Sequence, residues 1–396
     1  MIKYYAIKLN GFLWHAAKER DERMSAIYEN VLNLTPAMVI MWVIGGTLIY
    51  LAIKKDMEPT LLLPLGFGAI LVNLPLSGAI TQGTEAGVLD VLFNAGIANE
   101  LFPLLLFIGI GAMIDFSPLL SNPKMLLFGA AAQFGIFFTF AMAALFGFEL
   151  KDAASIGIIG AADGPTSIFV ANFFNSNYTG AIIVAAYSYM ALVPIIQPIV
   201  IRAITTKKER LIRMDIKNTY PVSKTAKILF PIVITAIAGL FAPKSVALVG
   251  FLMFGNLIRE CGVLNLLSET AQKELANLIT ILLGITVATK LQAEAFLNMQ
   301  TLLILLLGLV AFIFDTIGGV MFAKFINLFS KHKINPMIGA AGISAFPMSS
   351  RVIHKMGIKE DPQNFLLMHA ASANVAGQIA SVIAGGLIIN LVQPLL

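Results

Sequence analysis

The chain has 396 residues, of which 58% are hydrophobic and 12% are charged, with a formal net charge of +5. A soluble globular chain carries about 25% charged residues, so this chain has too few to solvate the surface of a large globular protein. The charges are also clustered, with nine in residues 1–33 and nine more in residues 205–227. The composition predicts an all-α polytopic membrane protein. It excludes a cytosolic enzyme, a nucleic-acid-binding protein and a secreted module.

Motifs for common cofactors, metals and disulfides are absent from the sequence. Cys261 is the one cysteine and allows no internal disulfide. The four histidines, His15, His332, His354 and His369, lack the spacing of zinc ligands. There is no P-loop and no glycine-rich dinucleotide motif after a strand. Function is therefore expected within the membrane-spanning part.

Residues 1–33 mix acidic and basic side chains and contain no apolar core, so they are not a secretory signal. Aromatic residues lie among these charges, at Tyr4, Tyr5, Phe12 and Trp14. This combination predicts an amphipathic N-terminal segment along the membrane interface.

Apolar runs of about 20 residues predict membrane-spanning helices. In chain order the clear runs are 34–53, 125–148, 180–204, 229–242 (shorter) and 301–323. Shorter runs interrupted by glycine and proline lie at 61–76, 101–114 and 245–258. The basic loop 205–227 is predicted to face the cytoplasm. It divides the membrane part into a first region, 34–204, and a second region, 228–396.

The two membrane regions resemble each other. The sequence IGAADG at 159–164 recurs in part as IGAAGI at 338–343. In each half a long apolar run precedes this segment and a stretch of small residues follows it. The pattern predicts two internal repeats, in inverted orientation, whose broken, re-entrant-type helices meet near the bilayer midplane and form the binding site. The alternative is ordinary packing of small residues between helices.

Asp163 is the main candidate site residue, because it lies in an apolar run and is followed at once by a helix-breaking Gly-Pro. A carboxylate buried in hydrocarbon is costly unless a cation, a proton or a partner compensates it. A broken helix also frees carbonyl groups that can coordinate Na⁺, and Thr166 and Ser167 add hydroxyl oxygens. The alternative is a helix-capping aspartate.

Other polar residues in apolar surroundings are further candidates. Tyr189 lies in an apolar helix, where a buried phenol needs a partner; an interfacial anchor is the alternative. Neutral ligand and glycine positions in the second half are Asn335, Gly339, Ser344 and Asn374. With these neutral groups around it, Asp163 would supply the negative charge of a Na⁺ site.

Arg351 and Asp315 are charged residues in the second half. Arg351 follows the second broken segment, where it could hold a carboxylate or extend to the interface as a loop cation. Asp315 lies inside an apolar run, where an acidic residue can serve either in helix packing or in an ion path.

At these residues the sequence resembles the membrane β subunit of biotin-dependent, sodium-pumping decarboxylases, a family that includes the β chains of oxaloacetate, methylmalonyl-CoA and glutaconyl-CoA decarboxylases. The resemblance rests on GAADGPT at 160–166, AYSYMALVPIIQP at 186–198, FPMSSRV at 346–352 and NVAG at 374–377. It covers essentially the whole chain after the N-terminal segment. Two departures are Ala161, where glycine is usual, and Ser372-Ala373, where Gly-Pro is frequent and the second break is therefore expected to be softer.

The resemblance implies that a partner subunit transfers a carboxyl group to biotin. The β subunit then decarboxylates carboxybiotin and couples this to Na⁺ export and proton uptake. By motif, Asp163, Tyr189 and Arg351 match catalytic positions, with Arg351 and Asn335 toward carboxybiotin. The implied Na⁺ positions are Asp163, Asn374, Tyr189, Ser344 and Gly339.

The resemblance also implies a multi-pass protein of a prokaryotic cell membrane that works with biotin-carrying, carboxyltransferase and small membrane subunits. Homo-oligomers remain open, as does the acid or acyl-CoA that the complex decarboxylates. The basic loop 205–227 could form part of the docking surface for a biotin domain or serve topology alone. A Na⁺-coupled secondary carboxylate transporter is the alternative function, since it would need the same broken helices and Asp163.

Overall fold

The structure is a computed structural model that describes residue 28 and residues 30–55, 59–214 and 222–396. Most of the predicted interfacial segment 1–33, and the middle of the basic loop, lie outside these residues. Every regular element in the described part is a helix. The all-α prediction is therefore confirmed.

Six helical stretches of the described chain are long and apolar enough to cross a membrane: Pro36–Lys55 (α2), Pro123–Leu145, Lys224–Phe241 (α13), Asn265–Lys290, Met299–Phe329 (α18) and Leu367–Leu395. Two further candidates are bent, α4 (Val88–Gly96) with α5 (Leu101–Met113) at 62°, and the two parts of α11 (Thr179–Ile204) at 69°. α3 (Pro59–Val72) is apolar but shorter. These spans confirm a polytopic membrane protein, whereas the two-repeat relationship stays a prediction.

The remaining elements are shorter helices that complete or connect these spans. They are α6 (Ser117–Ser121), η1 (Pro123–Met125), α7 (Leu126–Ala132), α8 (Phe134–Leu145), α9 (Leu150–Gly157), η2 (Ile158–Ala161), α10 (Gly164–Phe173), α12 (Lys207–Arg210), η3 (Pro243–Ser245), α14 (Val246–Cys261), α15 (Asn265–Thr270), η4 (Ala271–Leu275), α16 (Ala276–Val287), η5 (Ala288–Lys290), α17 (Ala293–Phe296), α19 (Met337–Ala340), α20 (Met348–Glu360), α21 (Leu367–Val392) and η6 (Gln393–Leu395).

Two predicted spans are less regular than expected. The run 125–148 is interrupted at Gln133, whose Nε2 donates to the carbonyl of Gly129 at 2.9 Å. α11 bends between Met190 and Leu192, because Pro194 has no N–H to donate to the carbonyl of Met190. The stretches Asn265–Lys290 and Leu367–Leu395 were not among the predicted spans.

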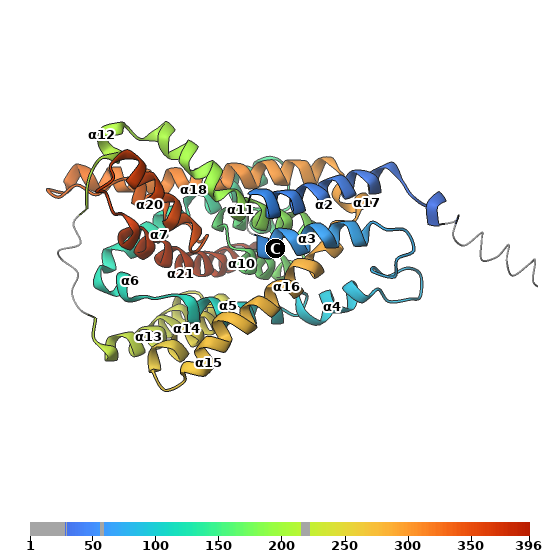
Figure 1. Ribbon diagram of the computed structural model, residues 1–396, viewed down its shortest axis with the longest axis horizontal. Coiled ribbons are helices and arrows are strands. Elements are labelled where there is room, and N and C mark those ends of the chain that lie inside the picture. The colour runs from blue at the N-terminus through green and yellow to red at the C-terminus, as the bar shows by residue number, and fades with distance from the viewer. Residues whose placement is uncertain (1–27, 29, 56–58, 215–221) are drawn as a thin grey trace, which may run out of the picture.

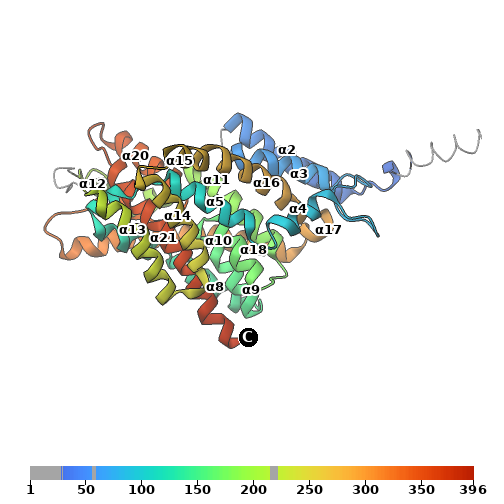
Figure 2. The same cartoon turned by 90° about the horizontal axis from the view of Figure 1, so that it is seen from below.

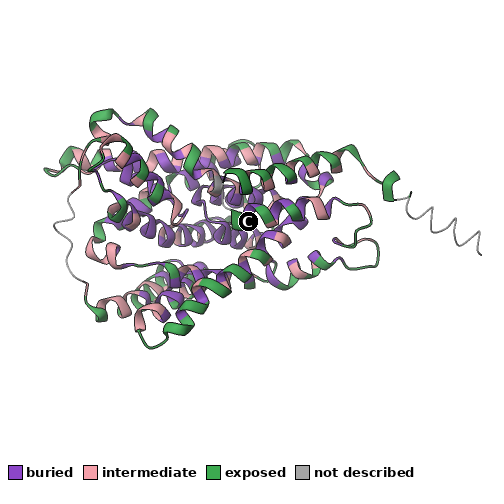
Figure 3. Cartoon of the chain, viewed as in Figure 1, coloured by how far each residue is buried: buried purple, intermediate pink, exposed green. Residues whose placement is uncertain are grey.

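The helices form a bundle whose centre contains the broken segments. α10 and α21 lie in the middle, with α2 and α18 along one side and α13–α15 along another (Figure 1, Figure 2). Buried residues gather on the central helices, and exposed residues on the outer ones (Figure 3). In the apolar window of α21 72% of residues are buried, against 11% in α13 and 17% in α2. α13 and α2 therefore present most of their apolar surface to lipid or to a partner.

Glycines let the backbone of central helices touch the second broken segment. A Cβ on Gly319 of α18 would lie 2.1 Å from the carbonyl oxygen of Gly339. A Cβ on Gly377 of α21 would lie 2.2 Å from the carbonyl oxygen of Gly342. Contacts this close require small residues, as is common between membrane helices.

Basic residues gather at one end of the bundle, where Figure 1 shows α12, α20, α6 and α13. Arg210 pairs with Glu360 at 2.9 Å and Arg213 with Asp361 at 2.5 Å. The hydrogen bond from Arg213 holds the pKa of the Asp361 carboxyl below its usual range. By the positive-inside rule we expect this end to face the cytoplasm, and we call it the basic end.

Candidate sodium site

The first helix break places Asp163 at the start of α10. η2 ends at Ala161, Ala162 adopts the left-handed conformation with φ of 50°, and Asp163 is extended. Pro165 lies in the first turn of α10, where its missing N–H costs no helical hydrogen bond. The Gly-Pro that follows Asp163 therefore ends one helix and begins the next, as the sequence predicts.

The Asp163 carboxylate is buried and bonded only to neutral groups. It accepts hydrogen bonds from Thr166 Oγ1 at 2.6 Å, from Ser381 Oγ at 3.1 Å and from the Thr166 N–H at 3.5 Å. Asp163 is 4% exposed, and no basic side chain in the described chain pairs with its carboxylate. The helix cap predicted as the alternative is therefore present, but it leaves the negative charge without a counter-charge.

The second helix break lies between α19 and α20 and supplies Ser344 to the same place. The softer break expected at Ser372-Ala373 does not occur, because α21 continues through these residues as one helix. Ser344 Oγ lies 2.8 Å from Ser381 Oγ, so a chain of hydroxyls leads to Asp163. The Ser344 N–H donates to the carbonyl of Ala161 at 3.3 Å, which joins the two breaks directly. The structure thus brings Asp163 and Ser344 close together, although they are 181 positions apart in the sequence.

α21 forms a polar face behind the two breaks. Asn374, Gln378 and Ser381 are spaced by four and three residues, so they share one side of the helix. Gln378 Nε2 donates to Ser344 Oγ at 2.5 Å and Asn374 Nδ2 to the carbonyl of Ile343 at 2.7 Å. Asn374 Oδ1 is buried and accepts no hydrogen bond in the described structure, and Asn374 lies behind the residues that line the Asp163 cavity rather than among them. Gln378 and Ser381 were missed from the sequence, although their helical spacing from Asn374 was a usable signal.

The two tyrosines of the Tyr-Ser-Tyr motif have different environments. Tyr189, the predicted site residue, points away from Asp163 and donates its hydroxyl to the carbonyl of Leu305 in α18. Tyr187 lines the Asp163 cavity, and a Cβ on Gly164 would lie 2.2 Å from its ring. The Tyr187 hydroxyl is buried and has no partner in the described chain.

Asn335 and Gly339 do not line the Asp163 cavity. Asn335 Nδ2 donates to the carbonyls of Arg210 at 2.9 Å and Ile212 at 2.8 Å, and so holds the basic end together. Gly339 allows the close contact with α18 described above. In this structure both residues support the second break rather than touch the cavity.

Arg351 lies in the first turn of α20, just beyond the rim of the cavity. Its N–H donates to the carbonyl of Pro347, which lines the cavity together with Phe346. The side chain is exposed and has no ion pair in the described chain. Arg351 is therefore available to an anion that approaches from the basic end.

Asp315 is buried in α18 but does not line the cavity. Its carboxylate faces the N–H groups of Gly135 and Ile136 at the start of α8, although the geometry falls short of a good hydrogen bond. A Cβ on Gly135 would lie 2.4 Å from Asp315 Oδ1. This contact favours helix packing over an ion path for Asp315.

The cavity itself has a volume of about 220 Å³. Its lining comes from α3, α5, α10, α11, α16, α21 and the second break, and includes Thr60, Asp163, Tyr187, Asn277, Thr280, Ser344 and Gln378. In the described chain no three His, Cys, Asp or Glu residues are placed so that they could hold a metal ion together. One carboxylate among neutral oxygens suits an alkali cation better than a transition metal.

Comparisons with known proteins agree with these features. A family model described as "Na+-transporting oxaloacetate decarboxylase beta subunit" matches residues 37–392. A methylmalonyl-CoA decarboxylase subunit beta from Propionigenium modestum is 49% identical over 381 residues, covering 91% of this chain and 96% of the relative.

Two more relatives act in decarboxylases with other substrates. An oxaloacetate decarboxylase beta chain from Klebsiella pneumoniae is 44% identical, and the match covers 94% of this chain and 99% of the relative. A glutaconyl-CoA decarboxylase subunit beta from Acidaminococcus fermentans is 49% identical, and the match covers 89% of this chain and 92% of the relative. Because the matches span nearly all of each protein, the chain belongs to the family of β subunits of Na⁺-transporting decarboxylases, which are parts of multi-subunit complexes.

Proposed function

We propose that this chain decarboxylates carboxybiotin carried by a partner subunit and couples the reaction to Na⁺ export and proton uptake across the cell membrane of a prokaryote. The proposal rests on the position of the Asp163 carboxylate. This buried, uncompensated carboxylate lies where two broken helices meet, beside a cavity. Family membership favours this pump over a Na⁺-coupled secondary carboxylate transporter.

Na⁺ is held by the Asp163 carboxylate together with neutral oxygens. Thr166 Oγ1 and Ser381 Oγ already lie within hydrogen-bonding distance of the carboxylate. Ser344 and the free Oδ1 of Asn374 extend this set from the second half. A proton can neutralise Asp163 as Na⁺ does, so the two cations exclude each other at one carboxylate.

Carboxybiotin loses CO₂ when a proton reaches the nitrogen that carries the carboxyl group. The nitrogen keeps the electron pair of the broken N–C bond, the proton bonds to it, and CO₂ leaves. Arg351, exposed beyond the cavity rim, orients the anionic carboxyl group. The free hydroxyl of Tyr187 lies at the cavity and can donate this proton. Tyr189, on α11, is hydrogen-bonded to the carbonyl of Leu305 in α18.

The partners in this proposal are a biotin-carrying subunit, a carboxyltransferase subunit and a small membrane subunit. The relatives belong to complexes named for three substrates, oxaloacetate, methylmalonyl-CoA and glutaconyl-CoA. The carboxyltransferase therefore selects the substrate, and the β subunit meets carboxybiotin alone. The basic end around Arg210 and Arg213 is the face on which the biotin domain docks.

Replacing Asp163 by Asn tests the proposal directly. Loss of the carboxylate should lower Na⁺-dependent decarboxylation and Na⁺ transport about 100-fold, because the remaining ligands are neutral. Both are measured on the purified complex in vesicles. The matched control is Asp152→Asn, another buried acid, whose amide oxygen can still accept from Ser176. Near wild-type Na⁺ transport by Asp163→Asn would refute the site.

A further inference from the structure

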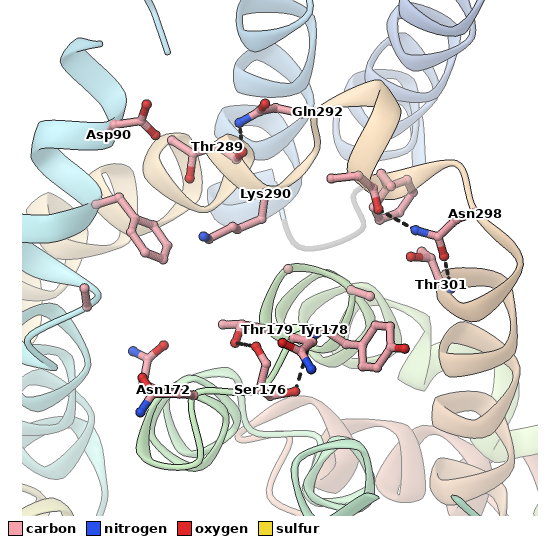
Figure 4. Close-up of a pocket in the computed structure, with 18 residues that line it drawn as sticks. Asp90, Asn172, Ser176, Tyr178, Thr179, Thr289, Lys290, Gln292, Asn298 and Thr301 are labelled. Atoms are coloured by element: carbon pink, nitrogen blue, oxygen red, sulfur yellow. Dashed lines mark hydrogen bonds between the residues drawn. The ribbon is translucent and has the colours of Figure 1, made fainter. Parts of the chain in front are cut away.

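A second cavity lies at the end of the bundle opposite the basic end. It has a volume of about 640 Å³ and is bordered by α4, η5, α17 and the junction between α10 and α11. Figure 1 shows α4 and α17 at the end far from α12 and α20. The polar lining residues that Figure 4 labels are Asp90, Asn172, Ser176, Tyr178, Thr179, Thr289, Lys290, Gln292, Asn298 and Thr301. We call this space the outer cavity.

α10 joins the outer cavity to the Asp163 cavity. Asp163 caps its first turn, and Asn172, in its last turn, lines the outer cavity. Between them Ile168, Val170 and Ala171 are fully buried. The two cavities therefore face opposite ends of the bundle and are separated by the apolar middle of one short helix.

Lys290 is the basic residue among those that line the outer cavity. Its ammonium nitrogen lies 4.4 Å from the centre of the Phe93 ring, a cation–π contact. The Asp90 carboxylate lines the same cavity and attracts the ammonium, but it lies beyond ion-pair distance. Figure 4 shows its side chain pointing into the space between Asp90 and Thr179.

The backbone around Lys290 is firmly held. Asn73, at the end of α3, donates to the carbonyl of Leu291 at 2.7 Å and accepts from the Ala293 N–H at 2.8 Å. On the other side, a Cβ on Gly180 would lie 2.5 Å from the Cβ of Lys290. The Lys290 ammonium is therefore held in the outer cavity, unlike that of a lysine whose side chain extends freely from the surface.

We propose that the outer cavity is the vestibule through which Na⁺ leaves, and that the Lys290 ammonium repels Na⁺ there and keeps it from returning to Asp163. The inference rests on the proposed function. The lining oxygens, most of them neutral and one group of them the Asp90 carboxylate, give Na⁺ a hydrated exit path, and the Lys290 cation shortens its stay. For a Na⁺ about 7 Å from the ammonium, with an effective dielectric constant of about 40 to 80, the repulsion lowers Na⁺ occupancy about three- to eightfold.

The test measures how Na⁺ on the outer side inhibits the pump. The complete complex is reconstituted with its basic end outward, and the initial rate of radiolabelled Na⁺ uptake is measured against Na⁺ already in the lumen. Each variant is normalised to its own rate with a Na⁺-free lumen. Lys290→Met should be inhibited at luminal Na⁺ concentrations about three- to eightfold lower than the wild type, and Lys290→Arg should match the wild type.

Lys244→Met is the matched control. The Lys244 ammonium also lies over an aromatic ring, that of Phe173 at the end of α10, at 5.6 Å from its centre, but Lys244 does not line the outer cavity. Its inhibition curve should equal that of the wild type. A Lys290→Met curve equal to the wild type would overturn the inference. Absence of Na⁺ uptake by the wild type itself would instead overturn the proposed function.

Sidedness is checked by thiol labelling after Cys261, the chain's one cysteine, is replaced by Ala. Ala295→Cys, at an exposed position in the outer cavity, should react with a membrane-impermeant reagent from the outer side only. Thr60→Cys, at the Asp163 cavity, should react from the side of the basic end only. Reaction of Ala295→Cys from the side of the basic end would overturn the vestibule.

Discussion

The break before α10 presents a carboxylate, whereas the break before α20 presents only hydroxyl and carbonyl oxygens. Asp163 and Ser344 nevertheless share one hydrogen-bonded chain through Ser381. A cation at the site therefore draws its charge compensation from the first half and completes its coordination from the second. Ion binding is expected to pull the two breaks together, because neither supplies enough ligands alone.

The largest effect on stability is expected at Gly377, where α21 packs against the second break. Gly377→Val would push side-chain atoms into the backbone of Gly342 and Ile343, since even a Cβ would lie 2.2 Å from the Gly342 oxygen. We expect a loss of about 3 kcal/mol in the free energy of unfolding, measured by thermal unfolding in detergent. Gly250→Val is the control, because a Cβ there would meet its nearest neighbour at 3.7 Å. Equal stability of the two variants would mean that the second break tolerates displacement.

Hydroxyls from the two breaks should differ in their effect on Na⁺ affinity. Thr166 bonds the carboxylate directly at 2.6 Å, so Thr166→Val should raise the Na⁺ concentration for half-maximal activity about 10- to 100-fold, as for a charged hydrogen bond. Ser344→Ala removes a neutral partner and should raise it about two- to tenfold. The measurement is the Na⁺ dependence of decarboxylation. A larger effect at Ser344 would place the ion nearer the second break.

The next comparison concerns the two tyrosines. Tyr187→Phe removes the free hydroxyl at the cavity and should lower the decarboxylation rate about tenfold or more, as for a proton donor. Tyr189→Phe breaks the bond to Leu305 and should mainly lower stability, by about 1 kcal/mol. Rates and thermal unfolding are measured for both variants. A rate loss confined to Tyr189→Phe would support the assignment made from the sequence.

The smallest effect is expected at the basic end. The pKa of Asp361 is lowered by Arg213, so the ion pair stabilises the fold above the unfolded pKa of about 4 and is lost as pH falls through the lower folded value. Thermal unfolding of the wild type and of Asp361→Asn should therefore differ by the same amount at every pH from 6 to 8. A difference that changes across this range would show that another group titrates with the pair.

Much of the first break could be predicted from the sequence, because its cause is local. Gly164-Pro165 favours a helix boundary, because the proline fits the first turn of a helix and disrupts its interior. An aspartate just before it can cap the helix that follows. The proximity of Asp163 and Ser344, which are linked through Ser381, was expected from the likeness of the two segments. These two inferences needed no knowledge of side-chain direction.

The rest depended on which side of each helix faces the centre. Tyr187 and Tyr189 are two positions apart, about 200° around an α-helix, so only one can face Asp163. α11 carries a bend near them, and the sequence does not fix its rotation. Ser381 and Gln378 share a helix face with Asn374, which the spacing does predict, but the side of α21 that faces Asp163 depends on its neighbours.

The short length of α10 has an electrical consequence. Its ten residues span about 15 Å at 1.5 Å per residue, half of a hydrocarbon core of about 30 Å. With water in both cavities, most of the transmembrane voltage falls across this one helix, so the local field is about twice that of an unbroken bilayer. A Na⁺ that passes from Asp163 to the outer cavity works against nearly the whole voltage in that step, about 2.3 kcal/mol per 100 mV. The voltage dependence of the pump should therefore reside in the movement past α10, and the delivery of carboxybiotin at the other end should be almost insensitive to it.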